Sequence, residues 1–385
     1  STQGVSSAAS DVYKRQDQIV LNWGVLGPGR IAKTFVNDLL HSKDELRPDV
    51  NSGKIKHQLI AVASHSSIDN AKKFKKEAIH EKSNDLIKCY GSYDEVLNNP
   101  KVDIVYISTV NSSHFKICYD ALQHNKNVLM EKPFTVNHKQ AEILAALAKK
   151  KNLFLMEAYW TRYNPVYKDV YKYLFTDNRT ADESSIGKIK RIVTDLSYFF
   201  DEADPLMNRI YNPALGGGAL LDIGIYALYW VLGFIGKPDE SLAFPKITAS
   251  AALADTGVDI STAAILKYAK GKIGVSSCSG YFTNKAHKVL INGTQGSVEV
   301  DDSCRPNEYW IYDKDHKLLS HKSYTYDGEG MFFEADHVAH CLAKGLKESP
   351  LHTMDDAILM SKVLDTIRDQ VNNKYPESIE STEIN

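Results

Sequence analysis

Apolar runs alternate with helix-like stretches along the first 160 residues. The run at 19–27, IVLNWGVLG, ends in glycine and is followed by RIAKTFVNDLL, in which apolar residues recur at helical spacing. Four more strand-like runs, with helix-like segments between them, cover 57–64, 102–109, 127–132 and 153–160. Buried strands that alternate with helices are typical of a parallel sheet covered on both faces. This region is therefore predicted to be a doubly wound, nucleotide-binding domain.

The pattern changes from about residue 189 onward. Strand candidates follow one another without helices between them, and short turns such as Lys270–Gly271 separate them. Such runs predict an antiparallel sheet. An apolar helix at 215–230, LGGGALLDIGIYALYW, interrupts the series early, and helix-like segments return at 332–345 and 354–370. We expect these last two helices to pack against the first domain or the domain junction.

Together these patterns predict an α/β protein with a Rossmann doubly wound parallel sheet, followed by an α+β domain with a large, mostly antiparallel open sheet. The length of 385 residues also favours two domains, because one hydrophobic core rarely serves so long a chain. The predicted parts are a disordered tail or expression remnant at 1–16, a dinucleotide-binding domain at 17–160, a second, α+β domain at 161–330, and C-terminal helices at 331–385 that pack back at the domain junction.

Composition narrows the classes of partner. A formal net charge of −2, without a basic cluster, argues against nucleic acid. The longest apolar run, 223–235, is shorter than the roughly 20 residues that span a bilayer, so we expect no membrane association. Five scattered cysteines and an opening segment without a hydrophobic signal core predict a cytoplasmic protein. His337 and His340 have metal-binding spacing, but no further ligand completes a set, so no metal is expected.

A glycine pattern follows the first predicted strand. GVLGPGRIA places Gly27, Gly29 and Ala32 in the spacing G-x-G-x-x-A. The first glycine allows a tight turn, the second lets the backbone approach a pyrophosphate, and the small third residue lets helix and strand pack closely. Glycine turns are common, but this one lies inside a β-α-β series. We expect a dinucleotide to bind against Gly27, Pro28, Gly29, Arg30 and Ile31.

The end of the second strand decides between the two nicotinamide cofactors. An acidic residue there binds the ribose diol of NAD, but this strand ends in Ala63, Ser64 and His65. Hydroxyl groups and a histidine can instead hydrogen-bond a 2′-phosphate, with Lys72 or Lys73 as a charge partner. NADP is therefore predicted over NAD, although no arginine is present at this position.

Polar residues also follow the next strands. Because the carboxyl ends of parallel strands share one edge, residues there should converge with the glycine loop. At this edge we expect cofactor contacts from Ser64, His65, Ser108, Thr109, Asn111, His114, Glu131 and Lys132. The alternative for Lys132 is a surface lysine that ends a strand.

The apolar helix at 215–230 carries two polar groups. Asp222 and Tyr226 are four residues apart, so they stack on one helical face. They are either half of an active site or a capping acid beside a core tyrosine with a satisfied hydroxyl.

Four motifs, GVLGPGRIA, EKP, EAYWTRYNP and GGGALLDIGIY, occur in the order seen in the glucose-fructose oxidoreductase/inositol dehydrogenase (Gfo/Idh/MocA) family, and the resemblance runs over 19–376. Many members have a histidine where this sequence has Tyr226. The tyrosine resembles the dimeric dihydrodiol dehydrogenases and the fungal NADP-dependent D-xylose dehydrogenases. That subgroup often has arginine where His65 stands, and 41–56, 78–87 and 176–185 look like insertions.

The resemblance implies a catalytic pair, Lys132 and Tyr226, with Asp222 nearby. It places Trp160 and Arg162 near the nicotinamide, His114 in the loop after the strand at 102–109, and a dimer interface on the open sheet. Substrate contacts are expected from Lys132, Trp160, Asp222 and Tyr226.

The chemistry expected is hydride transfer between a carbinol carbon and NADP. Tyr226 would exchange the hydroxyl proton, and the ammonium of Lys132 would lower the pKa of the phenol, ordinarily about 10. Asp222 would orient one of them or bind a substrate hydroxyl, and the triple glycine would let backbone approach a ligand. The favoured substrate is D-xylose, oxidised at C1 to the lactone. Alternatives are a trans-dihydrodiol, a dicarbonyl or keto-sugar, and a non-catalytic dinucleotide-binding regulatory role.

Overall fold

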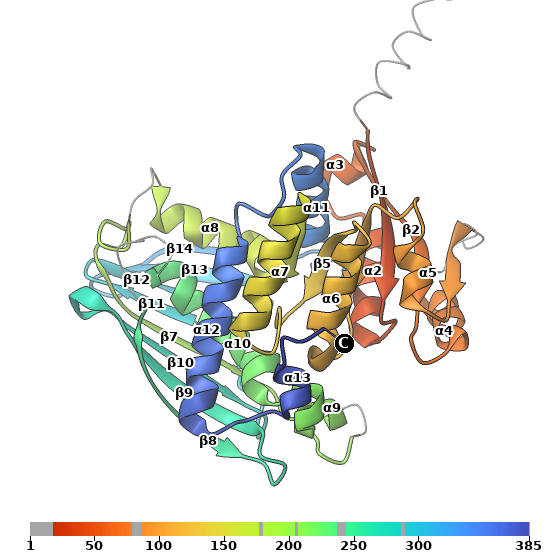
Figure 1. The fold of residues 1–385 in the computed structure, drawn as a ribbon. Coiled ribbons are helices and arrows are strands. Elements are labelled where there is room, and N and C mark those ends of the chain that lie inside the picture. Colours follow the sequence, from red (N-terminus) through yellow and green to blue (C-terminus); the bar gives the residue numbers. More distant parts are fainter. Residues whose placement is uncertain are drawn as a thin grey trace, which may run out of the picture.

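A computed structural model describes residues 18–78, 86–176, 180–204, 207–236, 244–285 and 289–384. Two sheets lie side by side, a six-stranded sheet built from the first 160 residues and an eight-stranded sheet built from the later strands (Figure 1). The predicted tail at 1–16 lies outside the described residues, as do parts of the insertions predicted at 78–87 and 176–185.

The first sheet is wholly parallel, in the order β3-β2-β1-β4-β5-β6. Its strands are β1 (Ile19–Leu26), β2 (Ile55–Ala63), β3 (Lys88–Tyr90), β4 (Ile104–Ile107), β5 (Asn127–Glu131) and β6 (Leu155–Ala158). This order reverses between β1 and β4, which is where doubly wound sheets bind their ligands. The predicted Rossmann architecture is confirmed, and only β3, which is three residues long and begins with an exposed lysine, was missed.

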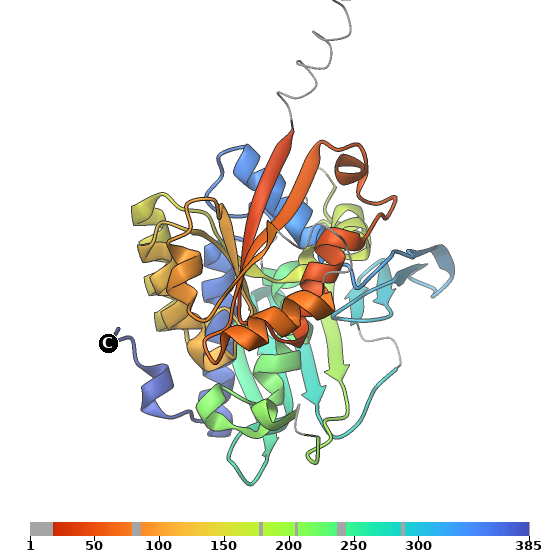
Figure 2. The same cartoon turned by 90° about the vertical axis from the view of Figure 1, so that its right-hand side faces the viewer.

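Helices cover both faces of this sheet (Figure 2). On one face, apolar residues of α2 (Arg30–His41), α4 (Ile68–Ala78) and α11 (Phe332–Ala343) form a core with the strands. On the other face the core is formed with α5 (Tyr93–Leu97), α6 (His114–Gln123) and α7 (His138–Lys151). The amphipathic spacing of these segments explains the placement, because each buries one apolar stripe against the sheet.

The second sheet has the order β14-β13-β12-β11-β7-β10-β9-β8. Its strands are β7 (Ile189–Ser197), β8 (Lys246–Leu253), β9 (Asp259–Lys267), β10 (Ile273–Ser279), β11 (Val289–Gly293), β12 (Gly296–Val300), β13 (Glu308–Asp313) and β14 (Leu318–Ser323). The mostly antiparallel sheet is confirmed, with one exception: β7 runs parallel to β10. Because β7 lies between β10 and β11, which run in opposite directions, it can be antiparallel to only one of them. The exposed edge strand β14 was not predicted.

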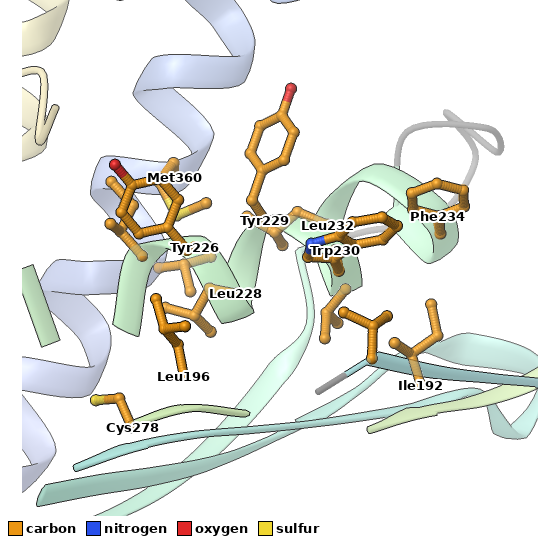
Figure 3. Close-up of a cluster of buried hydrophobic side chains, with 14 of the residues drawn as sticks. Ile192, Leu196, Tyr226, Leu228, Tyr229, Trp230, Leu232, Phe234, Cys278 and Met360 are labelled. Atoms are coloured by element: carbon orange, nitrogen blue, oxygen red, sulfur yellow. The ribbon is translucent and has the colours of Figure 1, made fainter. Parts of the chain in front are cut away.

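One face of the second sheet is covered by a long helical stretch that contains the π-helical turn η7 (Leu220–Gly224), α10 (Ile225–Val231) and a second π-helical turn, η8 (Leu232–Gly236). By length and composition the stretch Pro213–Ile235 could cross a membrane, with a mean hydropathy of 1.7, but 94% of its most apolar window is buried inside the protein. It is therefore a core helix. Figure 3 shows Leu228 directed toward the sheet, while the hydroxyl groups of Tyr226 and Tyr229 point away from it.

The remaining helices connect the two sheets. The α12 helix (Met354–Val371) lies beside α7 and packs on β8, and α11 packs against α2 and β1 (Figure 1). The short helices are α3 (Pro48–Asn51), α8 (Pro165–Leu174), α9 (Asn208–Tyr211) and α13 (Glu377–Glu380). The insertion at 41–56 is tied down by Arg47, whose buried guanidinium forms a two-pronged ion pair with Asp336 on α11. This insertion therefore stabilises the outer helix layer. The domain boundaries that we placed from the sequence stay predictions.

Candidate active site

The glycine loop has the geometry that a dinucleotide requires. Gly27 has a positive φ of 91°, and a Cβ there would lie 2.6 Å from Cγ2 of Thr109. At Gly29 an added Cβ would meet no atom within 4 Å, so open space faces this backbone. Gly29 caps α2 without any side-chain hydrogen bond, and the first turn carries no acid. Its N–H groups and helix dipole suit a pyrophosphate.

The other residues that we predicted to contact the cofactor near this loop lie at the start of α2 and at the end of β2. Pro28 is half-buried, whereas Arg30 and Ile31 are exposed at the start of α2. At the end of β2, Oγ of Ser64 lies 3.1 Å from Oγ of Ser66. The His65 side chain is exposed, and the centroid of its ring lies 6.0 Å from that of the Tyr93 ring. These hydroxyl groups and the imidazole fit a phosphate better than a ribose diol that needs an acid.

In the loop after β4, the residues predicted to contact the cofactor form hydrogen bonds with other parts of the protein. Ser108 donates from Oγ to the carbonyl of Gly27 at 2.9 Å, so it supports the glycine turn. The hydroxyl of Thr109 accepts from Ser113 at 2.8 Å, and the amide of Asn111 donates to the carbonyl of Gly216 in the second domain at 2.8 Å. These three residues therefore hold the loop next to the glycine turn and against the second domain.

His114 lies in the protein interior, between two loops. It is fully buried, with Nδ1 2.8 Å from the carbonyl oxygen of Pro133 and Nε2 3.2 Å from that of Thr109. Burial lowers the pKa of this imidazole. Both ring nitrogens face backbone carbonyls of the two loops that His114 joins, and its contact with a cofactor stays a prediction.

Arg162 also lies in the protein interior. It is buried against the rings of Tyr167 and Tyr171, with its guanidinium carbon 4.7 Å and 4.6 Å from their centroids, and it donates to the carbonyl of Leu351 at 2.8 Å. A buried cation stacked in this way stabilises the core. The structure thus shows a packing role for Arg162, and its contact with the cofactor stays a prediction.

Lys132 and Asp222 meet between the two domains. From the end of β5, the ammonium of Lys132 donates to the backbone oxygen of Asp222 at 2.5 Å and lies 3.3 Å from its Oδ1. The same nitrogen lies 5.1 Å from the centroid of the Tyr226 ring. The two side chains of the ion pair are only 12% and 14% exposed. The structure thus brings the three predicted catalytic residues together.

Arg209 is a second cation that contacts the carboxylate of Asp222. Nη1 of Arg209 lies 2.9 Å from Oδ1 of Asp222, and Nη2 lies 3.2 Å from Oδ2. Burial acts to raise the pKa of Asp222, but the charges of Lys132 and Arg209 outweigh it and hold that pKa well below its usual range. Of the two roles open for Asp222, these contacts favour orientation of Lys132 over binding of a substrate hydroxyl.

The hydroxyl of Tyr226 is held from the other side. The indole N–H of Trp160 donates to it at 3.1 Å, and the hydroxyl of Tyr159 donates to the backbone oxygen of Tyr226 at 3.2 Å. Burial raises the pKa of the Tyr226 phenol well above its usual value, and the nearby Cys304 and Glu131 add to this. The expected lowering of this pKa by Lys132 is therefore wrong. The ammonium lies over the ring and is directed toward Asp222.

Glu131 contacts the backbone of Lys132. It is buried, its Oε1 accepts from the hydroxyl of Tyr106 at 2.5 Å, and its Oε2 accepts from the backbone N–H of Lys132 at 3.2 Å. Burial raises the pKa of this carboxyl. These contacts fix the end of β5.

The triple glycine serves the protein's own packing. A Cβ at Gly216 would lie 3.0 Å from Cβ of Asn111, one at Gly217 would lie 2.3 Å from the carbonyl oxygen of Ile210, and one at Gly218 would lie 2.4 Å from Oδ1 of Asp259. The close approach is therefore to neighbouring protein atoms, whereas we expected a ligand.

Sequence reasoning missed Arg209, Tyr159 and Cys304. Arg209 and Cys304 lie in connecting segments, without a spacing that links them to Asp222 or Tyr226, and Tyr159 reads as a core residue. Within the described residues, no group of three or more His, Cys, Asp and Glu side chains is arranged to hold a metal ion. His337 contacts the hydroxyl of Ser349 at 2.9 Å, and His340 contacts Asp49 at 3.0 Å.

Comparisons with known proteins agree with this geometry. A model described as the oxidoreductase family with an NAD-binding Rossmann fold matches 21–159, and one for the GFO/IDH/MocA C-terminal domain matches 178–299. The trans-1,2-dihydrobenzene-1,2-diol dehydrogenase of Xenopus tropicalis is 32% identical over 360 residues, which cover 92% of this chain and 99% of the relative. The NADP(+) D-xylose 1-dehydrogenase of Hypocrea jecorina is 35% identical over 384 residues, which cover 93% and 94%.

A solved structure shares the fold. The 3-ketoreductase from Actinomadura kijaniata, crystallised with NADP and TDP-benzene, has a TM-score of 0.72 at 23% identity and covers 92% of this chain and 99% of its own. With the sequence relatives and the two domain matches, this leads to one conclusion. The chain belongs to the GFO/IDH/MocA oxidoreductase family, whose N-terminal domain is an NAD-binding Rossmann fold.

Proposed function

We propose that this protein is an NADP-dependent dehydrogenase that transfers hydride between a carbinol carbon of a sugar or cyclic diol and nicotinamide. The observation that carries the proposal is the meeting of Lys132, Asp222 and Tyr226 at the edge of the sheet that also holds the open glycine loop. NADP, when bound, supplies the hydride acceptor or donor. The residues of the chain bind the substrate oxygen, exchange its proton and exclude water.

Tyr226 acts as the proton-exchanging group. The indole of Trp160 donates to the phenol oxygen, so the phenol's own proton is directed elsewhere. Because burial raises its pKa, Tyr226 is protonated at neutral pH and is a ready acid for reduction of a carbonyl. Oxidation of a hydroxyl instead requires the phenolate, so the oxidation rate should rise with pH while reduction stays flat through neutrality.

Lys132 binds the reacting oxygen. Its ammonium has three N–H donors, and the contacts with Asp222 occupy two of them. The third stabilises the oxygen of the substrate as it gains negative charge, in a site where the surrounding side chains are largely buried. Asp222 and Glu131 fix this lysine from two directions.

The favoured substrate is D-xylose, oxidised at C1 to the lactone, with the trans-dihydrodiol of an arene as the second candidate. The relatives with these two activities match this chain over 94% and 99% of their own lengths, which supports both. A dicarbonyl or keto-sugar reduced in the reverse direction is a third option. An aromatic wall of Trp160 and Tyr226 beside a charged cluster suits a ring that carries adjacent hydroxyls.

The test is a screen of purified protein with NADP and a panel of aldoses, polyols and dihydrodiols, followed by absorbance of the reduced nicotinamide. D-Xylose should give the highest kcat/KM. No turnover of any panel member, together with tight cofactor binding, would shift the assignment to a regulatory role. Cofactor choice is measured in the same assay: a tenfold preference for NAD, about 1.4 kcal/mol, would contradict the assignment to NADP.

The protein is further proposed to be a cytoplasmic homodimer with no nucleic-acid or membrane partner. The support for a dimer is the uncovered face of the second sheet. Along β9 and β10 the side chains alternate between buried and exposed, and Ala263, Ile265 and Ile273 lie on the exposed face. Apolar side chains on an open sheet suit burial against a second copy.

A further inference from the structure

Arg209 lies on α9, a four-residue helix that comes shortly before the triple glycine, and its guanidinium faces Asp222 as a fork. The two N···O distances are 2.9 Å and 3.2 Å, and the Arg209 side chain is 38% exposed. Paired contacts of this kind fix the plane of a carboxylate as well as its place. Lys132, from the other domain, approaches the same carboxylate through Oδ1.

We propose that Arg209 is a positioning residue for the hydride-transfer reaction: it holds both carboxylate oxygens of Asp222, and Asp222 in turn holds the ammonium of Lys132 toward Tyr226. The inference rests on the proposed function, since it assigns Lys132 to the reacting oxygen. Arg209 acts through Asp222, so it is distinct from the catalytic residues that touch the substrate.

The charges explain why a second cation is needed. A buried carboxylate with a single lysine would form a closed ion pair, which would draw the ammonium away from the substrate oxygen. With Arg209 bound to both carboxylate oxygens, the charge of Asp222 is compensated without Lys132. The ammonium of Lys132 can then stabilise the negative charge that grows on the substrate oxygen. Glu131 and Tyr226 are the other titratable groups close to Arg209.

The triple glycine makes this contact sterically possible. A Cβ at Gly217 would lie 2.3 Å from the carbonyl oxygen of Ile210, 2.8 Å from that of Arg209 and 2.9 Å from that of Asn212. Glycine therefore lets the backbone of α9 lie directly against the start of the helix that carries Asp222. The N–H of Gly218 also donates to the carbonyl of Ile210 at 2.7 Å. This packing explains the second of the three glycines that precede the apolar helix.

The experiment compares Arg209→Met and Arg209→Lys with a matched control, Lys322→Met. Lys322, like Arg209, is a partly exposed cation that pairs with a carboxylate, here that of Asp169, and this pair lies on α8 and β14, away from the site. Arg209→Met should lose about tenfold or more in kcat, since small displacements of reacting groups have effects of this size or larger. The KM for NADP should change less than twofold. Arg209→Lys should recover part of the loss, and Lys322→Met should keep wild-type kcat.

The pH profile separates positioning from a merely structural role. Without Arg209, the pKa of Asp222 loses one of the two charges that hold it down, so the acid limb of kcat/KM should move to higher pH. Wild-type kcat in Arg209→Met would overturn the inference. Equal loss in both Arg209 variants, with a lowered Tm and an unmoved acid limb, would also overturn it.

A measurement without turnover keeps this test independent of the proposed function. With ¹³C-labelled aspartate, the carboxyl resonance of Asp222, assigned by its absence in Asp222→Asn, should remain that of an ionised carboxylate through the pH range in which ordinary aspartates titrate. In Arg209→Met the titration should move upward. If the titration of Asp222 in Arg209→Met is the same as in wild type, the proposed role of Arg209 is wrong even if the enzyme is active. A moved titration in a protein that turns over no panel substrate supports the Arg209–Asp222 coupling and rejects the proposed function.

Discussion

Tyr226 shows how one residue combines two contacts that the sequence does not connect. Its oxygen accepts from the indole of Trp160, and its ring lies under the ammonium of Lys132. Burial raises the pKa of the phenol, so in the proposed mechanism the lysine acts on the substrate oxygen and does not lower the pKa of the phenol. This separates the roles of the two residues more clearly than a mechanism in which the lysine activates the tyrosine.

Substitution of Tyr226 by phenylalanine removes the proton-exchanging group without changing the shape of the ring. We expect kcat to fall by roughly 10² or more, while the affinity for NADP measured by fluorescence titration stays near wild type. Tyr229→Phe is the matched control, because this hydroxyl lies one turn further along α10 and contacts Nδ1 of the buried His352 at 3.1 Å. A Tyr226→Phe enzyme with wild-type kcat would remove Tyr226 from the mechanism.

Glu334 carries a prediction about stability and pH. Its carboxyl is fully buried on α11, and within the described residues neither of its oxygens has a hydrogen-bond partner. Burial raises the pKa of Glu334 well above its usual value, and Glu131, Asp38 and Glu157 raise it further. The folded protein therefore holds this proton more tightly than the unfolded chain, so the free energy of unfolding falls as pH rises above about 4.3.

Glu334→Gln removes this titration. The variant should match wild type near pH 5 or lie close to it, and become more stable than wild type toward pH 8, as measured by urea unfolding at both values. Glu95→Gln, on the exposed side of α5, makes the same chemical change without burial and should show no such trend. A constant difference between Glu334→Gln and wild type across this range would show that Glu334 does not titrate as the structure implies.

At the scale of elements, the helix that begins after the triple glycine starts with a π-helical turn at Leu220–Gly224. Asp222 lies in this turn, and its backbone oxygen accepts from the ammonium of Lys132. Extra residues of this kind in a helix are frequent at functional sites. The simple helical face predicted from the spacing of Asp222 and Tyr226 is therefore interrupted, although both residues still reach the same cluster.

Gly217→Ala tests the packing of α9 against this turn. The added Cβ would collide with backbone carbonyls, which cannot rotate away as a side chain can. We expect a loss of about 1–3 kcal/mol in the free energy of unfolding and a fall in kcat from displaced Arg209. In Gly91→Ala the nearest atom would lie 3.6 Å from the new Cβ, so this control should be tolerated. Equal stability of the two variants would contradict the packing argument.

At the scale of the whole molecule, the active site exists only because the two domains meet. Lys132 comes from the first sheet, whereas Asp222 and Arg209 come from the segment between β7 and β8. The chain after α12 returns to this junction: Asn373 donates to Asp259 at 2.8 Å, and the hydroxyl of Tyr375 donates to the carbonyl of Gly217. The contact of Tyr375 thus ties the C-terminal segment to the triple glycine.

The proposed dimer is tested on the open face of the second sheet. Ile265→Lys places a charge among exposed apolar side chains on β9, and we expect it to convert a dimer into a monomer in sedimentation velocity. Val20→Lys, at an exposed apolar position of β1, is the control and should leave the assembly unchanged. A wild-type monomer, or an Ile265→Lys variant that remains dimeric, would contradict the proposed interface.

The amino-acid sequence by itself determined the Rossmann domain and the positions of Gly27, Gly29 and Lys132 at one sheet edge. It could do so because a β-α-β pattern repeats locally and makes the strands parallel, so that every strand's carboxyl end lies at the same edge. Asp222 and Tyr226 were also recognisable, because their spacing and the family resemblance both pointed to them. These features depend on residues that are close in the chain.

Only the tertiary structure decided what surrounds each group. It paired Asp222 with Arg209, buried His114 and Arg162, and raised the pKa of Tyr226 where a lowered one was expected. It also set β7 parallel to β10. The physical reason is common to all four: burial, charge and strand direction depend on segments brought together from distant parts of the chain, and no spacing within one segment records them.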